Sequence, residues 1–524
     1  MSTSGRTIVD ALARSVAEHG DRVAIDDGAR RLTYSDLSTR VRDVAAALVA
    51  SGVEKGDVVS LWAPNSAEWI QAFLGLEHAG AALAPINTRF KGREAAEILA
   101  RSHAKVLITV DRFLDVDYVE MLRATDIDLP DLTTIVVIGA QAADGCITWD
   151  DLLARADDAS RAEAGARAER VSVDDVSDIL FTSGTTGTPK GVVQTHGRTM
   201  CVADDWVVMA GLQAGDVYLM VNPYFHMFGM KAGILASTSA GATMLPEPVF
   251  DISRVLKRVQ DEKVTVLPGA PTIYQAMLDA PDRASFDLSS LRVAVTGSAD
   301  IPVELIRRIF AELPFTTVVS GYGLTEAGTA SGTGPDDDAT TVATTVGRAR
   351  PGFELRVVDA AGNEVAAGEP GEVTLRGGSV MSHYLDNPEA TAAALSPDGW
   401  LRTGDLGVVQ PDGCLRIVGR AKDMFIVGGF NAYPAEIENS LLRHPAVQQV
   451  AVIGIPDPRL GEVGCAFIVP NDGVAVTAEQ IIAWSRDEMA NYKVPRHVVF
   501  LDSLPINATG KVVKDELRAR VSPD

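Results

Sequence analysis

Short apolar runs alternate with alanine-rich, helix-patterned stretches over most of the first 400 residues of this chain. The apolar runs include 58–62, 105–110, 134–138, 264–267 and 293–296, and helical spacing of apolar residues is clearest over 66–79 and 251–262. Apolar runs without polar alternation are typical of strands that helices cover on both faces. The pattern therefore predicts an α/β fold with layered, mostly parallel sheets.

The pattern of hydrophobic and turn-forming residues changes twice in the last third of the sequence. Between Glu354 and Arg376, Gly and Asp turns separate short segments of alternating hydrophobicity, which predicts a small antiparallel section. The last hundred or so residues hold two β-rich runs and two helical stretches, enough for a separate α+β domain. We therefore predict an N-terminal domain over 1–420 and a C-terminal domain over 421–524. The polar segment 155–175 is expected to be a surface connection.

Composition excludes several classes of function. The net charge of −23 argues against nucleic acid or an anionic membrane as the main partner. The four cysteines are widely spaced, which argues against a zinc site or a disulfide framework and favours a reducing compartment. No apolar run is long enough to span a bilayer, and the N-terminus lacks an apolar signal core. We expect a cytoplasmic protein without a transmembrane segment.

Residues 179–192 indicate the chemistry most directly. A short apolar run leads into Thr182-Ser-Gly-Thr-Thr-Gly-Thr-Pro-Lys190. Small residues let the backbone approach an anion, hydroxyls add donors and Lys190 adds a mobile charge, so this loop is suited to phosphate groups. It is not the common nucleotide loop, because Thr-Pro separates Gly187 from Lys190. Taken alone, it also fits a polar connection after a strand.

Two further clusters lie at 320–326 and 400–406. In Ser-Gly-Tyr-Gly-Leu-Thr-Glu, two glycines fit a tight turn that presents Tyr322 to a planar ligand. A Glu326 carboxylate beside a phosphate site makes sense mainly as a Mg²⁺ ligand. Asp405, after a Thr-Gly turn, is suited to accept both hydroxyls of a ribose. The alternatives are a strand-ending turn with an exposed glutamate and an Asx-turn.

The remaining two clusters mark the C-terminal block. Charged residues with small neighbours at 419–423, followed by Gly-Gly-Phe-Asn at 428–431, suit a hinge at a domain boundary. A glycine precedes Lys511, and a loop of this kind can deliver a lysine as a point charge to another domain's site. The alternatives are a solvated linker and an ordinary turn.

In this order and spacing, the five clusters resemble those of the adenylate-forming enzymes, which include acyl- and aryl-CoA synthetases, amino-acid adenylation domains and beetle luciferases. The resemblance covers essentially the whole chain, including 32–37 and 80–87. It implies a mobile C-terminal lid and a two-step reaction that uses ATP, Mg²⁺ and CoA. A carboxylate first attacks the α-phosphorus of ATP to give acyl-AMP and pyrophosphate, and a thiol, usually that of CoA, then displaces AMP.

The resemblance also implies roles for individual residues. The loop 183–190 would hold the β- and γ-phosphates, Thr325 would contact the α-phosphate, and Glu326 would hold Mg²⁺. Tyr322 and 297–299 would sandwich adenine, while Asp405 and Arg420 would bind the ribose. The implied nucleotide site comprises Thr182, Ser183, Gly184, Thr185, Thr186, Gly187, Lys190, Gly297, Ser298, Ala299, Ser320, Gly321, Tyr322, Gly323, Asp405 and Arg420.

The lid residues are implied in the same way. Lys511 would bridge the attacking carboxylate and the α-phosphate, and Lys422 would be the hinge. Gly428, Gly429 and Phe430 would approach the CoA tunnel. Phe430 replaces a glutamate common in this family, and Ser320 stands where Asp or Asn often meets the amino group of adenine.

The segment 224–229 holds no carboxylate to pair with a substrate amine, and no carrier segment follows Lys511, so a free-standing CoA ligase is favoured over an amino-acid adenylation domain. Further segments resemble a branch of bacterial ligases for polycyclic isoprenoid acids, either the indane-dione propanoate of steroid breakdown or diterpenoid acids. They are 178–184, 228–236, 266–275, 339–345 and 427–438.

The implied acid pocket is apolar, and its methionines give adaptability. His226 would orient and gate the substrate, and Lys231 would reach a ketone, unless it is a surface or core-edge lysine. His196 is expected to be structural. The pocket comprises His226, Met227, Met230, Lys231, Ile234 and Gly323, with Leu235 beside them.

Alternatives to this reaction remain open at the level of the sequence. They are an adenylate-only enzyme that hands acyl-AMP to another protein, a luciferase-type oxygenase, and a ligase for medium-chain or aryl acids. The expected partners are a small carboxylic acid, ATP and CoA; a homodimer is left open.

Overall fold

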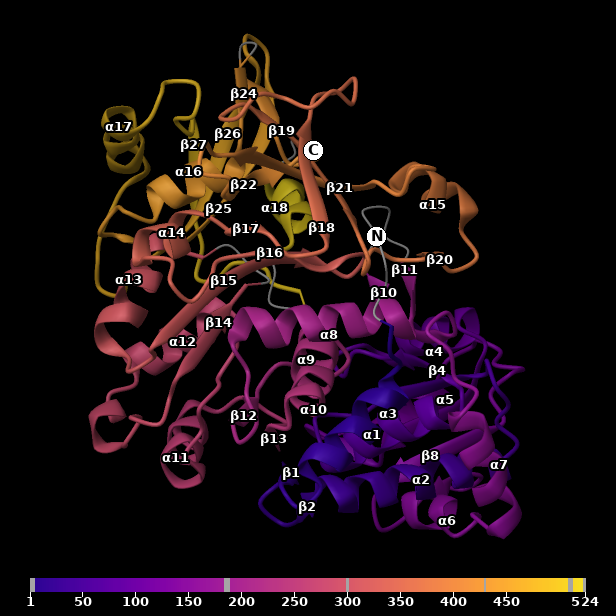
Figure 1. Cartoon of the computed structure of the whole chain (residues 1–524). Coiled ribbons are helices and arrows are strands. Elements are labelled where there is room, and N and C mark those ends of the chain that lie inside the picture. Colours follow the sequence, from indigo (N-terminus) through magenta and orange to yellow (C-terminus); the bar gives the residue numbers. More distant parts are fainter. Residues whose placement is uncertain (1–4, 183–188, 298–300, 428–429, 508–511, 522–524) are drawn as a thin grey trace.

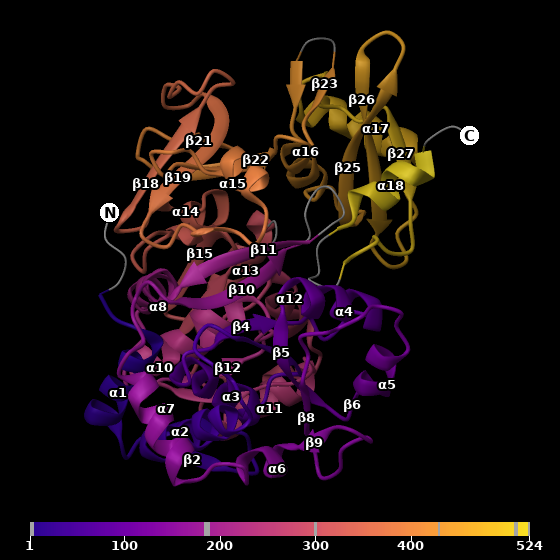
Figure 2. The same cartoon turned by 90° about the vertical axis from the view of Figure 1, so that its right-hand side faces the viewer.

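The computed structural model describes residues 5–182, 189–297, 301–427, 430–507 and 512–521. A large N-terminal domain of mixed, mostly parallel sheets and helices lies below a small C-terminal α+β domain in both views (Figures 1 and 2). This architecture confirms the predicted fold class.

The largest sheet has the strand order β20-β11-β10-β4-β3-β5-β8-β9. Neighbouring strands from β10 to β9 pair in parallel, whereas β11 pairs antiparallel with β10 and β20 antiparallel with β11. The strands are β3 (Val58–Trp62), β4 (Ala82–Pro85), β5 (Ala104–Val110), β8 (Thr134–Ile138), β9 (Ile147–Thr148), β10 (Val176–Thr182), β11 (Lys190–Thr195) and β20 (His383–Tyr384).

Both faces of this sheet are buried, which explains the absence of polar alternation in its strands. On β3, Val59 and Leu61 belong to one apolar cluster, and Trp62 belongs to another on the opposite face. Helices on the two faces supply the partners: α1 (Ile8–His19), α2 (Tyr34–Ala50), α3 (Ala67–His78), α6 (Trp149–Leu153) and α7 (Asp158–Ala168) on one, and α4 (Gly92–Arg101) and α5 (Tyr118–Arg123) on the other.

A second layer combines two four-stranded sheets, β12-β13-β1-β2 and β14-β15-β16-β17. The run 264–267, predicted as a strand, contributes isolated bridges at Val266 that join the two sheets. The strands are β1 (Val23–Asp26), β2 (Arg31–Thr33), β12 (Val217–Met220), β13 (Thr243–Pro246), β14 (Val293–Thr296), β15 (Thr317–Leu324), β16 (Gly328–Gly332) and β17 (Arg348–Ala349). The helices of this half are α8 (His196–Ala210), α9 (Met227–Gly229), the π-helix η1 (Met230–Leu235), α10 (Ala236–Ala240), α11 (Ile252–Glu262), α12 (Pro271–Asp279), the 3₁₀-helix η2 (Arg283–Ser285), α13 (Val303–Glu312) and α14 (Ala339–Thr344).

An antiparallel sheet, β18-β19-β21-β22, occupies the predicted antiparallel section and extends it to residue 420. Its register pairs Asp405 with Arg420 at the end that faces the nucleotide segments. The elements are β18 (Phe353–Val358), β19 (Pro370–Gly377), α15 (Pro388–Ala394), β21 (Leu401–Val409) and β22 (Leu415–Arg420).

The C-terminal domain is built on the sheet β24-β23-β26-β25, with β27 paired in parallel to β26. Its hairpin β23–β24 lies at the end away from the N-terminal domain in both views (Figures 1 and 2). The elements are β23 (Phe425–Val427), β24 (Phe430–Ala432), α16 (Pro434–Leu441), β25 (Val447–Asp457), β26 (Gly461–Pro470), α17 (Ala478–Glu488), β27 (His497–Phe500) and α18 (Lys514–Val521).

The segment 155–175 differs from its prediction as a surface connection, because α7 occupies its centre. Only Ser160 and Ala164 of α7 are buried, so its apolar face is too narrow to give a sequence signal. A short hairpin, β6 (Arg112–Phe113) and β7 (Val116–Asp117), completes the strands of the described residues. Among the residues that the structure describes, no helix is long and apolar enough to cross a membrane.

Candidate active site

Strands β10 and β11, which flank the phosphate-loop segment in the sequence, pair antiparallel near one edge of the large sheet. Thr182 pairs with Lys190 across β10 and β11. Ile179 and Leu180 are buried and anchor the strand that enters the loop. Ser183, Gly184, Thr185, Thr186 and Gly187 lie outside the described residues.

Tyr384 connects the two charged groups predicted for the phosphate site. Its ring centroid is 5.0 Å from the Lys190 ammonium, and its hydroxyl donates to Glu326 Oε1 at 2.8 Å. Burial and the Glu326 carboxylate raise the pKa of Tyr384, so the hydroxyl remains a donor at neutral pH. The structure thus brings Lys190 and Glu326 to one tyrosine that the sequence analysis did not single out.

The ribose and adenine candidates meet on the other side of this centre. Asp405 accepts from the Tyr322 hydroxyl at 2.6 Å and pairs with Arg420 Nε at 3.2 Å. Burial and the Asp405 charge raise the pKa of Tyr322 well above its usual range. The three predicted residues therefore form one connected polar group centred on Asp405.

A close backbone approach explains the glycines of this region. A Cβ atom on Gly297 would lie 2.9 Å from the Gly321 carbonyl, and one on Gly323 would lie 2.2 Å from the Gly328 carbonyl. Only glycine fits at such distances. Ser320 is buried, and its hydroxyl donates to the Thr345 carbonyl at 3.1 Å. Ser298 and Ala299 lie outside the described residues, and Thr325 follows β15 beside Glu326.

The acid-side candidates lie on consecutive short helices. His226 begins α9, and its Nδ1 accepts from the Phe228 amide at 3.2 Å, so a neutral ring carries its proton on Nε2. Met230 and Ile234 are fully buried on η1, and Met227 packs at the edge of the same core cluster. These side chains are part of the apolar core in this structure, and their role as walls of an acid pocket stays a prediction.

Lys231 is placed differently from its predicted reach toward a substrate ketone. Its ammonium is buried and lies 2.8 Å from Asp178 Oδ1. Burial lowers the pKa of Lys231, while the charges of Asp178 and Glu77 oppose that shift. The lysine is therefore a core residue with a carboxylate partner in this structure.

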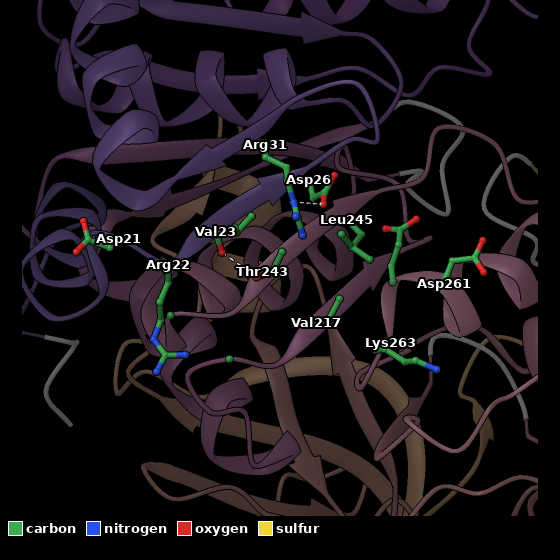
Figure 3. A pocket seen from close by; sticks show the side chains of 13 residues that line it. Asp21, Arg22, Val23, Asp26, Arg31, Val217, Thr243, Leu245, Asp261 and Lys263 are labelled. Carbon is green, nitrogen blue, oxygen red and sulfur yellow. Dashed lines mark hydrogen bonds and ion pairs between the residues drawn. The ribbon is translucent and has the colours of Figure 1, made fainter.

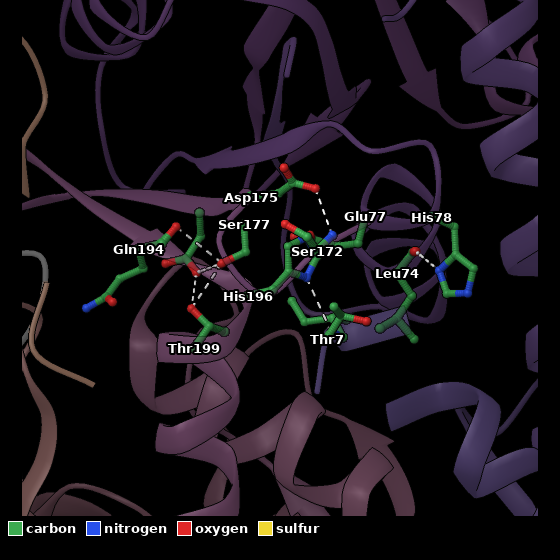
Figure 4. Close-up of polar contacts among 12 residues, drawn as sticks. Thr7, Leu74, Glu77, His78, Ser172, Asp175, Ser177, Gln194, His196 and Thr199 are labelled. Atoms are coloured by element: carbon green, nitrogen blue, oxygen red, sulfur yellow. Dashed lines mark hydrogen bonds and ion pairs between the residues drawn. The ribbon is translucent and has the colours of Figure 1, made fainter. Parts of the chain in front are cut away.

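His196 belongs to the same buried region and has the structural position expected of it (Figure 4). Its Nδ1 accepts from the Ile8 amide at 3.3 Å, and its Nε2 lies 3.2 Å from Glu77 Oε2. Burial lowers the pKa of His196 to about 4 and raises that of Glu77 well above its usual range. Burial therefore disfavours the charged form of both groups, and neither Glu77 oxygen has a hydrogen-bond partner among the described residues.

Two of the lid candidates, Lys422 and Phe430, fall within the described residues. Lys422 is exposed in the turn after β22, next to Asp423, which pairs with Arg518 of α18 at 3.2 Å. Phe430 is 60% exposed and stacks on Tyr492 with ring centroids 5.1 Å apart. Gly428, Gly429 and Lys511 lie outside the described residues.

A surface pocket of about 500 Å³ lies elsewhere, along the edge formed by β1, β2, β12 and β13 (Figure 3). Arg22, Arg31 and Lys263 line it together with Asp21 and Asp261, so its charges largely offset one another. None of the candidate site residues is among its lining.

Comparison with known proteins identifies relatives of the whole chain. Residues 12–385 match the AMP-binding enzyme family, and residues 436–511 match the AMP-binding enzyme C-terminal domain. A protein of Rhodococcus jostii named 3-[(3aS,4S,7aS)-7a-methyl-1,5-dioxo-octahydro-1H-inden-4-yl]propanoyl:CoA ligase is 48% identical over 521 residues, which cover 99% of each chain. A protein of the same name from Mycobacterium tuberculosis is 48% identical and covers 98% of each chain.

A solved relative has the same two-domain fold. The crystal structure of the anthranilate CoA ligase AuaEII in complex with anthranoyl-AMP gives a TM-score of 0.88 at 32% identity, over 98% of this chain and 97% of that one.

Fold and relatives together define the class, a ligase that activates its substrate with ATP. The chain belongs to the AMP-binding enzyme family and is an AMP-forming acyl-CoA ligase. The predicted boundary at 420/421 falls between the two family matches and stays a prediction.

Proposed function

We propose that this ligase converts a polycyclic, steroid-derived carboxylic acid first to acyl-AMP and then to acyl-CoA. The observation that carries the proposal is the 48% identity, over 99% of both chains, to a ligase named for an indane-dione propanoate. The apolar side chains of Met230 and Ile234 in the implied acid pocket would suit the bulky alicyclic body of such an acid.

In the first half-reaction, an anionic acid approaches a polyanion, so positioning and charge stabilisation dominate the barrier. Lys190 and the 183–188 loop would hold the β- and γ-phosphates. Asp405 and Arg420 would hold the ribose. Lys511, which lies outside the described residues, would bring its charge between the carboxylate and the α-phosphate.

Mg²⁺ is the metal that this chemistry implies, and the residues present fit it. No group of three or more His, Cys, Asp or Glu side chains suited to a metal occurs among the described residues. Mg²⁺ bound with nucleotides needs only one or two carboxylates, because phosphate oxygens and water complete its shell. Glu326, held by Tyr384 and close to Lys190, would supply that carboxylate. When bound, the ion offsets charge on the departing pyrophosphate.

The test is a CoA-dependent AMP-release screen of the wild-type protein across steroid-derived, diterpenoid, aryl and straight-chain acids. We expect the highest kcat/KM with an indane-dione propanoate. A preference for aryl or medium-chain acids would contradict the substrate assignment but not the reaction. Pyrophosphate release without CoA consumption would instead indicate an enzyme that hands acyl-AMP to another acceptor.

A further inference from the structure

The ammonium of Lys231 belongs to a buried polar cluster in the core. It donates to Thr199 Oγ1 at 2.9 Å and pairs with Asp178, and both members of the ion pair are at most 1% exposed. Thr199 donates in turn to Asp178 Oδ2 at 2.5 Å, and Ser177 donates to the same oxygen at 2.8 Å (Ser177 and Thr199 are labelled in Figure 4). Such additional hydrogen bonds are what a buried ion pair needs to offset its loss of water.

The cluster joins elements that carry opposite sides of the active site. Asp178 lies on β10, four residues before Thr182, where the phosphate loop begins. Lys231 lies on η1, five residues after His226. Thr199 is on α8, which packs between them. One buried contact therefore links the strand that enters the phosphate loop to the segment that lines the acid side.

The segment that carries Lys231 has an unusual backbone conformation. Residues 230–235 form a π-helix, a conformation that is rare and found mostly as short turns at functional sites. Its hydrogen bonds run from i to i+5, and a buried side chain that ties such a turn to neighbouring elements acts as an anchor. The Lys231 ammonium is such an anchor, at the second residue of the π-helix.

We propose that Lys231 is a positioning residue, which through Asp178 and Thr199 fixes the segment 226–235 against β10 and so sets the acid relative to the ATP phosphates. It does not contact the acid. This inference rests on the proposed function, because it concerns the acid side of the same site.

The main test is Lys231→Met, which keeps the length of the side chain and removes its charge. We expect kcat/KM for the acid in ATP–pyrophosphate exchange to fall about 100-fold, the effect of a misplacement near 1 Å, with KM for ATP within about threefold of wild type. Two acids are compared, an indane propanoate with a ring ketone and its analogue with methylene instead. Equal losses support positioning. A loss confined to the ketone acid would make Lys231 a substrate ligand and overturn the proposal.

A double variant, Lys231→Met with Asp178→Asn, separates positioning from stability. Removing one partner leaves a buried, uncompensated charge, whereas removing both restores neutrality, so the double variant should melt higher than the single one. The exchange defect should persist, because the link is still missing. Exchange that recovers together with the melting temperature would overturn the proposal. Should the single variant fail to fold, the double variant is tested with the same two acids.

A matched control removes a partner of a buried carboxylate elsewhere. Arg292 pairs with Asp216 at 2.5 Å, and the Asp216 side chain is 3% exposed. Arg292→Met should lower the melting temperature without changing KM for the acid; an equal change in KM would mean that general destabilisation explains the Lys231 variant. If the wild-type protein is inactive with every acid, the proposed function is contradicted. If the wild-type protein is active and Lys231→Met is equally active, only the inference about Lys231 is contradicted.

Discussion

Single residues at the phosphate site act through orientation as much as through charge. Tyr384 holds Glu326 Oε1 with its hydroxyl and lies against Lys190 with its ring. It comes from β20, which pairs with β11 after an interval of almost two hundred residues, so its place beside Glu326 depends on the sheet and not on any local motif. This is why Tyr384 was not predicted, whereas Lys190 and Glu326, which stand inside recognisable clusters, were.

Tyr384→Phe removes the hydroxyl and leaves the ring. A hydrogen bond to a charged group contributes about 1.5–3 kcal/mol, so we expect the Mg²⁺ concentration for half-maximal pyrophosphate exchange to rise roughly tenfold. The melting temperature should change little, because the ring keeps its packing. Titration of Mg²⁺ at saturating ATP and acid measures the effect. An unchanged Mg²⁺ requirement would contradict the role of Tyr384 in holding Glu326.

At the scale of elements, the end of α3 links stability to pH. His78 is buried in its last turn and donates from Nδ1 to the Leu74 carbonyl at 2.7 Å. Burial lowers the pKa of His78 to about 4 from 6.5. Between these values the unfolded chain binds the extra proton, so stability is complete above pH 6.5 and is lost as the pH falls toward 4. His196, also with a pKa lowered to about 4 by burial, adds a second proton in the same window.

His78→Asn keeps a donor for Leu74 and removes one titrating group. We expect its free energy of unfolding to fall less steeply between pH 6.5 and 4.5 than that of wild type, by up to about 1.4 kcal/mol per pH unit. Urea unfolding at several pH values measures the slope. Gln141→Asn, at an exposed residue that does not titrate, serves as the control and should leave the slope unchanged. Parallel slopes for wild type and His78→Asn would contradict the assignment.

Elements with a strong internal pattern were predictable, and those defined by distant partners were not. The runs 58–62 and 293–296 coincide with β3 and β14. They were predictable because a continuous apolar run indicates a buried strand from the local sequence alone. The polar helix α7 was missed since only two of its residues are buried. Lys231 was taken for a surface, core-edge or substrate-binding residue because Asp178, its counterion, lies 53 residues earlier in the chain. The π-helix has no sequence signature that could have revealed it.

At the scale of the whole molecule, the family resemblance implies that the two half-reactions use different sides of the C-terminal domain. In this structure the hairpin β23–β24 lies at the end remote from the N-terminal domain, with Phe430 exposed (Figures 1 and 2). If that hairpin is to meet CoA at the active site, the domain must rotate. We propose that the exposed turn at Lys422, between β22 and the Asp423–Arg518 ion pair, absorbs the change in backbone angles.

Two substitutions should therefore separate the half-reactions in opposite directions. Lys422→Pro fixes one backbone angle of the turn and restricts the preceding residue, so pyrophosphate exchange should stay within about threefold of wild type while thioester formation slows by about 100-fold or more.

Lys511→Ala removes the charge that adenylation would need, so exchange should fall by about 100-fold or more, whereas conversion of supplied acyl-AMP to acyl-CoA should fall far less. Single-turnover assays of each half-reaction measure both. Full retention of CoA ligation by Lys422→Pro would contradict a pivoting lid. Equal losses in both half-reactions for Lys511→Ala would contradict the role of Lys511 in adenylation.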